Sequence, residues 1–290
     1  MATTRAPASP LLLVLTAVVS VQFGGALAAT LVPEIGAAGS VTLRLLFATA
    51  ILLAWARPSL RGHSPTAWRT VVAFGLALGL MNLAFYASLE HLPIGVAVTV
   101  EFLGPLTLAT VLARRARDLA AVAAAAVGVV LISRALEVPL ASVEWTGLAL
   151  AAAAGACWAA YILASGRAGR EFASFDGLAL AMTVAFVVTL PLGLRTVPQW
   201  SGESVLKGLG IAVLSSVLPY SLELAALRHL SARAFGILLS LEPAAAALAG
   251  FLVLHQRLTG RQLVGMALVV LASVLVMGAG QRREPAAAGG

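Results

Sequence analysis

The chain has 290 residues, of which 60% are hydrophobic and only 11% are charged. A soluble globular protein carries roughly a quarter charged residues, because its surface must face water. The composition therefore excludes a soluble domain and fits a chain whose solvent is mostly lipid. The net charge of +7 does not indicate nucleic-acid binding, because the basic residues are scattered between apolar runs and form no single basic face. The single cysteine, Cys157, cannot form an intrachain disulfide.

Ten apolar runs follow one another along the chain, and each is long enough to cross the roughly 30 Å hydrocarbon layer as a helix. The expected membrane spans are residues 10–32, 39–56, 68–89, 93–113, 118–136, 145–165, 175–194, 205–227, 232–254 and 263–280. The connections between them are short, which leaves no room for a soluble domain. Residues 281–290 are small and polar, and we expect them to form a disordered tail.

The basic residues of the short loops predict the orientation of these spans. With the N-terminus inside, thirteen arginines and lysines lie in inner segments and five in outer loops, which favours both termini inside. A rival interpretation takes residues 1–29 as a cleaved secretory signal, with Arg5, an apolar stretch and a cleavage site at Ala26-Leu27-Ala28. The apolar run continues through Val32, however, and this length favours a span.

An internal repeat relates the two halves of the chain. Residues 87–105 align with residues 225–243 at an offset of 138 without gaps, and six of the 19 positions are identical, including a His-Leu pair and a distant proline. Chance matches are expected in a chain rich in alanine and leucine, but they poorly explain why the His-Leu pair and the distant proline align without a gap. The offset aligns the fourth span with the ninth, five spans later. Because five is an odd number, the second copy has the opposite orientation in the membrane. We therefore expect an all-α integral membrane protein with ten transmembrane helices in an inverted five-plus-five repeat, a pattern typical of transporters. The first repeat would comprise residues 1–137 and the second residues 138–280.

Four charged residues lie inside the expected spans and away from their ends, where each is costly unless it is paired or faces a wet cavity. They are Arg44, Glu101, Glu223 and Glu242. Arg44 and Glu101 could reach similar depth in the membrane, where they would form either a buried pair that only fixes packing or part of a binding site. Glu242 has no obvious cationic partner in the sequence, which favours a functional role. Glu223 lies near the inner end of its span, where it reaches either water or Arg228.

Two prolines are predicted hinges of these spans. Proline cannot donate to the carbonyl four residues before it, so Pro105 frees the carbonyl of Glu101 and Pro243 frees that of Leu239. A freed carbonyl beside a carboxylate could receive an ammonium group or a proton.

Uncharged polar and aromatic residues of the spans complete the candidate binding site. For any one of them, a hydrogen bond between helices is the alternative explanation. The candidates are Gln22, Asn82, Tyr86, Trp158, Tyr161, Ser215, Ser216, Tyr220 and Ser240. Gly75 and Gly79 form a G-x-x-x-G pair in the third span, which we interpret as a close-packing face and not as a site.

Several motifs of other protein classes are missing from the sequence. It has no G-x-x-x-x-G-K-[ST] motif, so ATP is not the expected energy source, and no H-E-x-x-H motif, which disfavours a metalloprotease. The only aspartates, Asp118 and Asp176, lie at span ends, which disfavours an aspartyl protease. We therefore expect a transporter without a cofactor or a bound metal, and not an enzyme. A passive pore stays open as an alternative, although no filter-like motif is visible.

Long segments of the chain resemble a known transporter family. They include SVQFGGALA from Ser20, MNLAFYASLEHLPIGVAVTVEFLGP from Met81, GACWAAYILASGRAG from Gly155, LPYSLELAAL from Leu218 and AFGILLSLEPAAAALAGF from Ala234. The chain resembles the threonine/homoserine exporter branch of the drug/metabolite transporter superfamily, the EamA-type ten-helix carriers. This resemblance implies export of small neutral amino acids across the bacterial cytoplasmic membrane, driven by the proton gradient. One departure is His255-Gln256, where such carriers usually have Gly-Glu, so a carboxylate role there cannot be transferred.

The charged residues fit this implied substrate. A zwitterionic amino acid needs an anionic partner for its ammonium group, which Glu101 or Glu242 could supply. It also needs a cationic or dipolar partner for its carboxylate, which Arg44 or the end of a broken helix could supply. Export of another metabolite by the same fold remains an alternative, and the sequence makes no prediction of the oligomeric state.

Overall fold

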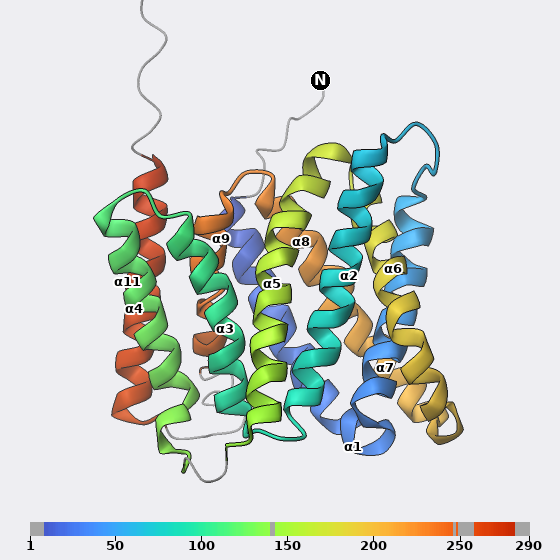
Figure 1. Cartoon of the computed structure of the whole chain (residues 1–290), viewed down its shortest axis with the longest axis horizontal. Coiled ribbons are helices and arrows are strands. Elements are labelled where there is room, and N and C mark those ends of the chain that lie inside the picture. Colours follow the sequence, from blue (N-terminus) through green and yellow to red (C-terminus); the bar gives the residue numbers. More distant parts are fainter. Residues whose placement is uncertain (1–8, 140–142, 246–247, 249–257, 282–290) are drawn as a thin grey trace, which may run out of the picture. The chain divides into compact units, whose positions relative to one another are not determined.

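The structure, a computed structural model, describes residues 9–139, 143–245, 248 and 258–281. Every regular element in this part of the chain is helical (Figure 1). Six segments within it are long and apolar enough to cross a membrane: Thr30–Ala56, Pro65–Ser88, Ala116–Ser133, Trp145–Glu171, Asp176–Gln199 and Gly202–Leu227. Shorter apolar helices accompany them at Pro10–Gly25, Val96–Val111 and Gly260–Leu275. The chain is therefore an all-helical, multi-pass membrane protein.

The helices follow the apolar runs of the sequence closely. They are α1 (Pro10–Ala56), α2 (Pro65–Ser88), α3 (Ile94–Val111), α4 (Ala116–Ser133), α5 (Trp145–Glu171), α6 (Asp176–Gly193), α7 (Gly202–Ala212), α8 (Leu218–Leu227), α9 (Ala232–Leu238) and α11 (Gly260–Gln281). Helices α3 and α6 begin and end within two residues of the expected spans 93–113 and 175–194. Short 3₁₀ turns follow α4 at Ala135–Glu137 and α6 at Leu194–Gln199.

Helix α1 combines the first two expected spans, which is a correction to the sequence analysis. We expected a loop between residues 32 and 39, but the chain stays helical there except at Gly36, which has φ 73° and ψ 170°. Residues with a Cβ atom rarely adopt this backbone conformation, whereas glycine does so without steric penalty. The connection between the two spans is therefore a glycine kink.

The expected span 205–227 is likewise interrupted without a loop. A π-helical turn, Val213–Val217, separates α7 from α8. Pro219 follows this turn and cannot donate a backbone hydrogen bond. The hydroxyl of Ser20 in α1 donates to the carbonyl of Leu214 at 2.6 Å, so a side chain from another helix stabilises the widened turn.

The chain divides into two compact units. Unit 1 comprises residues 1–83 and 163–230, and unit 2 comprises residues 84–162 and 231–290. In unit 1, α1 packs against α6, α7 and α8. In unit 2, α3 packs against α4 and α9, and α4 lies beside α11 (Figure 1). Each unit combines parts of both expected repeats, and the division of the sequence at residue 137 stays a prediction.

Glycines bring helices together inside unit 1. A Cβ atom at Gly75 would overlap the carbonyl oxygen of Ala181, and one at Gly79 would lie 3.2 Å from the Cα of Ala185. Both positions of the G-x-x-x-G pair thus pack α2 against α6, and its interpretation as a packing face is confirmed.

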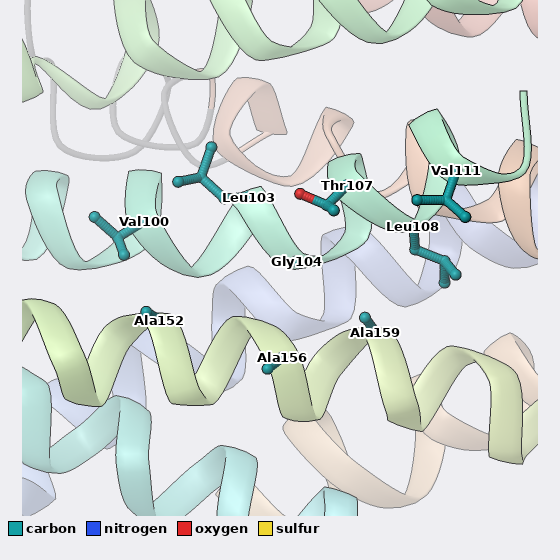
Figure 2. A pocket seen from close by; sticks show the side chains of 9 residues that line it. All are labelled: Val100, Leu103, Gly104, Thr107, Leu108, Val111, Ala152, Ala156 and Ala159. Atoms are coloured by element: carbon teal, nitrogen blue, oxygen red, sulfur yellow. The ribbon is translucent and has the colours of Figure 1, made fainter.

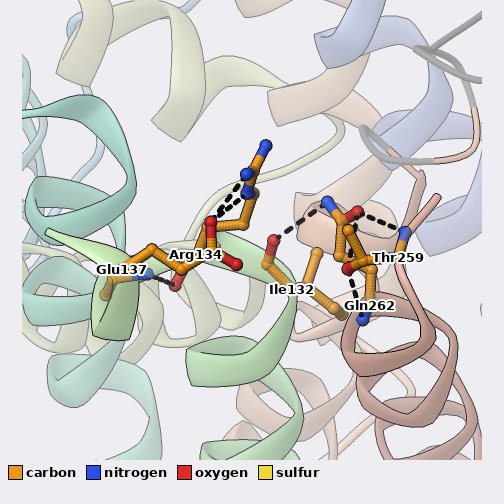
Figure 3. Close-up of polar contacts among 7 residues, drawn as sticks. Ile132, Arg134, Glu137, Thr259 and Gln262 are labelled. Atoms are coloured by element: carbon orange, nitrogen blue, oxygen red, sulfur yellow. Dashed lines mark hydrogen bonds and ion pairs between the residues drawn. The ribbon is translucent and has the colours of Figure 1, made fainter. Parts of the chain in front are cut away.

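Hydrogen bonds fix the neighbouring ends of α4 and α11 in unit 2 (Figure 3). At the start of α11, the Thr259 N–H donates to the Gln262 side-chain oxygen at 3.0 Å, and the Gln262 N–H donates back to the Thr259 hydroxyl at 3.3 Å. This reciprocal arrangement is a capping box. The Gln262 amide nitrogen also donates to the Ile132 carbonyl near the end of α4 at 3.4 Å. Beyond α4, Arg134 pairs with Glu137 at 2.6 Å.

A buried ion pair joins the starts of α4 and α9 in the same unit. Asp118 is 3% exposed, and its Oδ2 lies 2.6 Å from Nη1 of Arg233. The same oxygen accepts the Arg114 N–H at 3.1 Å. Arg117 is more distant, with its Nε 4.0 Å from Oδ1 and its side chain 42% exposed. From the sequence Asp118 was expected only as a span-end charge, and its pairing with Arg233 was not foreseen because 115 residues separate the two.

We expect Asp118→Asn to lower the free energy of unfolding by about 3 kcal/mol, because it leaves the partly buried charge of Arg233 without its counter-charge. Denaturant unfolding of the purified protein in detergent measures this. The matched control is Arg117→Gln, which removes an exposed charge near the same carboxylate and should cost less than about 1 kcal/mol. Equal losses in the two variants would contradict a stabilising pair.

Candidate functional site

The candidate binding residues fall into the two units. Unit 1 holds Gln22, Arg44, Asn82 and Tyr220, whereas unit 2 holds Tyr86, Glu101, Trp158, Tyr161 and Glu242. Gln22, Tyr86 and Glu242 are half-buried, and the others are buried. The arginine of the candidate site thus lies in unit 1, and the two glutamates with proposed roles lie in unit 2. The expected pair of Arg44 with Glu101 stays a prediction.

Arg44 and Asn82 contact each other inside unit 1. Both are buried, with 5% and 6% of their surface exposed. The Arg44 guanidinium donates from Nη2 to Oδ1 of Asn82. The Asn82 amide nitrogen donates in turn to the carbonyl of Leu78, one turn earlier in α2, at 2.7 Å. The structure therefore brings together two candidate binding residues that had no predicted contact with each other.

Glu101 lies at the closest approach of α3 and α5 in unit 2. Its side chain is buried, with 8% of its surface exposed. Pro105 cannot donate to the Glu101 carbonyl, and that oxygen faces Gly155 of α5, where a Cβ atom would lie only 2.5 Å away. A Cβ atom at Gly104 would overlap the Gly155 carbonyl. The freed carbonyl thus faces the α5 backbone, and α3 stays helical through Pro105.

One aromatic pair packs next to Glu101. The rings of Phe102 and Trp158 meet edge to face, with centroids 4.8 Å apart and an interplanar angle of 67°. Tyr161, one turn after Trp158 in α5, is only 1% exposed. The expected cavity role of Trp158 stays a prediction, because its observed contact with Phe102 is a packing contact.

A groove of about 420 Å³ runs between α3 and α5 (Figure 2). Its walls are Val100, Leu103, Gly104, Thr107, Leu108, Val111, Ala152, Ala156 and Ala159. Thr107 supplies the only side-chain polar atom of this lining, and none of the candidate binding residues belongs to it. Leu103 and Val111 are 52% and 75% exposed, as expected for side chains that face lipid. The groove therefore does not provide the charges that a zwitterion needs.

Glu242 lies where the ninth span is broken. Helix α9 ends at Leu238, residues 239–240 form a turn, and residues 241–245 are helical again. The Glu242 N–H donates to the Leu239 carbonyl at 2.9 Å. The Ser240 hydroxyl donates to the Ile237 carbonyl at 2.6 Å. The Leu239 carbonyl, to which Pro243 cannot donate, thus accepts the backbone N–H of Glu242. The helix is interrupted at residues 239–240, close to this predicted hinge. The rest of the span through residue 254, and His255-Gln256, lie outside the described residues.

One charge cluster was not foreseen from the sequence. In unit 1, Lys207 pairs with Glu34 of α1 and with Glu203 at 2.7 Å, and the Ser204 hydroxyl donates to Glu34 at 3.2 Å. The four-residue spacing of Glu203 and Lys207 is a recognisable signal of a helical pair. Glu34 had no such signal, because 173 residues separate it from Lys207.

Residues 9–139, 143–245, 248 and 258–281 contain no group of three or more His, Cys, Asp or Glu side chains that could hold a metal ion.

Comparisons with known proteins place the chain among membrane transporters. The profile of the EamA-like transporter family matches residues 145–278. The threonine/homoserine exporter RhtA of Salmonella typhimurium strain SL1344 is 40% identical over 267 residues, which cover 91% of this chain and 90% of that protein. RhtA of Escherichia coli strain K12 is 38% identical over the same shares of both chains. Protein PecM of Dickeya dadantii is 28% identical over 72% of this chain.

A solved crystal structure shares the fold. It matches 96% of this chain and 100% of its own, with a TM-score of 0.78 and 18% sequence identity. At this identity the likeness concerns the fold alone.

Proposed function

Because the chain belongs to the EamA-like transporter family, as a threonine/homoserine exporter-like member, we propose that it exports threonine, homoserine and similar small neutral amino acids. It is a transporter and not an enzyme. The observation that carries the proposed substrate is the 38–40% identity to the RhtA exporters over 91% of the chain. We place the protein in the bacterial cytoplasmic membrane, in accordance with its bacterial relatives.

The buried charges support this substrate class. An amino acid at neutral pH carries an ammonium group and a carboxylate, and buried charges must be compensated. In this proposal Glu101 or Glu242 receives the ammonium group and Arg44 receives the carboxylate. Gln22, Asn82, Tyr86, Trp158, Tyr161 and Tyr220 complete the proposed binding set.

Alternating access through an inverted repeat is part of the proposal. The offset of 138 carries α2 to residues 203–226, where α7, the π-helical turn and α8 span residues 202–227. It carries the second half of α1 (residues 39–56) to residues 177–194, where α6 lies. These two segments run antiparallel, because Thr42 donates to the Thr189 carbonyl at 3.2 Å and Thr49 to the Met182 carbonyl at 3.0 Å. Antiparallel packing of equivalent segments supports an inverted repeat.

Helices α4 and α11 make a reciprocal contact that supports the same relation. A Cβ atom at Gly128 would lie 2.8 Å from the Gly265 carbonyl oxygen, and one at Gly265 would lie 2.8 Å from the Gly128 carbonyl oxygen. Reciprocal contacts of this kind occur at two-fold axes. The two glycines are 137 residues apart, one less than the repeat offset. We propose accordingly ten transmembrane helices in two inverted halves, with both termini inside.

Growth of cells tests the proposed substrate. Bacteria that lack their own threonine exporters should grow at higher external threonine and homoserine when they produce this protein. Equal sensitivity with and without the protein, at verified membrane levels, would contradict the proposal.

We propose that the proton gradient drives export, since Glu101 and Glu242 could carry a proton and the sequence has no nucleotide-binding motif. In proteoliposomes loaded with threonine, acidifying the outside should accelerate efflux, and an ionophore that collapses the gradient should abolish the increase. Efflux that is independent of the imposed pH gradient would exclude proton coupling.

A further inference from the structure

The contact between Arg44 and Asn82 indicates how Asn82 acts within the proposed binding set. We propose that Asn82 is a positioning residue, which orients the Arg44 guanidinium toward the carboxylate of the amino acid. This inference rests on the proposed function, because it assumes that Arg44 receives that carboxylate.

The hydrogen bonds of Asn82 fix the orientation of its amide. Its nitrogen donates to the Leu78 carbonyl at 2.7 Å, and its oxygen accepts from Arg44 Nη2. The opposite orientation would direct the amide N–H groups at the guanidinium and the amide oxygen at a carbonyl oxygen, and both contacts would be repulsive. Asn82 therefore presents an acceptor to Arg44.

The neutrality of Asn82 is essential to this role. A guanidinium has five N–H donors in a rigid fork, and a neutral acceptor such as an amide oxygen orients this fork without reducing its charge. A carboxylate at the same position would form an ion pair with Arg44 and would compete with the substrate carboxylate. An amide thus orients the arginine and preserves its attraction for an anion.

The helix that carries Asn82 is firmly held. One turn before Asn82, Gly79 of α2 packs against Ala185 of α6, and Gly75 packs against Ala181 one turn earlier. A side chain on such a rigid element places its partner with more precision than one on a loop. Asn82 is therefore anchored both through its Leu78 bond and through the packing of α2.

Equilibrium binding of threonine and of threonine amide to the purified full-length protein tests the assignment. Asn82→Leu should weaken threonine binding about 10-fold or more, because a hydrogen bond to a charged group is lost. Asn82→Asp should weaken it at least as much, although it retains an acceptor. Binding of the amide, which lacks the carboxylate, should change less than about 3-fold in both variants.

A matched control separates positioning from a general loss of packing. Thr49→Val removes another buried hydrogen bond of unit 1, from α1 to the Met182 carbonyl, and should leave threonine affinity within about 2-fold of the parent. Equal losses in Asn82→Leu and Thr49→Val would overturn the inference. So would unchanged or tighter threonine binding in Asn82→Asp.

A double-mutant cycle with Arg44→Lys tests whether Asn82 acts through Arg44. Lysine keeps the charge but lacks the planar fork that Asn82 orients. In the Arg44→Lys background, Asn82→Leu should therefore change threonine affinity by less than about 2-fold. Fully additive losses would show independent action and would overturn the positioning role. Failure of the parent protein to bind threonine would instead contradict the proposed function.

Discussion

Threonine export should be lost when either Glu101 or Glu242 is replaced by glutamine, while the protein still reaches the membrane. Glutamine keeps the size of the side chain but removes the negative charge, so it neither compensates a substrate ammonium group nor carries a proton. A hydrogen bond to a charged group contributes about 1.5–3 kcal/mol. Loss of proton coupling would reduce export further. Threonine resistance of cells and efflux of radiolabelled threonine measure the effect, with membrane levels determined in parallel.

The matched control for these variants is Glu90→Gln. Glu90 lies just after α2 and is exposed, so its loss should leave export near that of the parent. Normal threonine resistance in cells that produce the Glu101→Gln protein and in cells that produce the Glu242→Gln protein would contradict the assignment of both glutamates.

Gly155→Ala should destabilise the protein by about 1–3 kcal/mol or more and should abolish most export. The added methyl group would lie 2.5 Å from the Glu101 carbonyl, a backbone atom that cannot rotate away. Helices α3 and α5 must separate to accommodate it, and this movement displaces Glu101. Thermal unfolding of the purified protein and threonine efflux measure the two effects.

Gly166→Ala provides a control in the same helix. The nearest atom to a Cβ at Gly166 is Arg170 Nη1 at 3.9 Å, so the methyl group fits. Alanine is favoured over glycine in a helix by up to about 1 kcal/mol, and this variant should be as stable as the parent or more so. If Gly155→Ala behaved in the same way, the close contact of α3 with α5 would not be required.

The helices could be predicted from the sequence to a large extent. The thickness of the bilayer sets the length of an apolar run, which is why α3 and α6 end within two residues of the expected bounds. The packing role of Gly75 and Gly79 was also predictable, because glycines four residues apart lie on one face of a helix. The missing N–H of Pro243 likewise predicted that the Leu239 carbonyl loses its usual helical partner, and the Glu242 N–H donates to this carbonyl in the structure.

Other features depend on contacts between distant residues, which a single sequence does not reveal. The π-helical turn at Val213–Val217 receives a hydrogen bond from Ser20, 194 residues away from Leu214. The pairs of Asp118 with Arg233 and of Glu34 with Lys207 likewise join separate helices. In the candidate site, the residue types were predictable but their partners were not. Asn82, a candidate binding residue from the sequence, accepts a hydrogen bond from Arg44, and the sequence did not predict this partner.

Counterflow with the purified protein tests the central claim most directly. Proteoliposomes that contain the protein and a high internal concentration of one metabolite are placed in a trace of radiolabelled threonine, and each member of a metabolite panel is tested as the internal substrate. We predict saturable, transient accumulation of label with internal threonine or homoserine, and little with charged or bulky metabolites. The same accumulation should be absent from liposomes without protein. Label entry that only equilibrates, does not saturate and is independent of the internal metabolite would indicate a passive pore and would contradict a threonine/homoserine exporter.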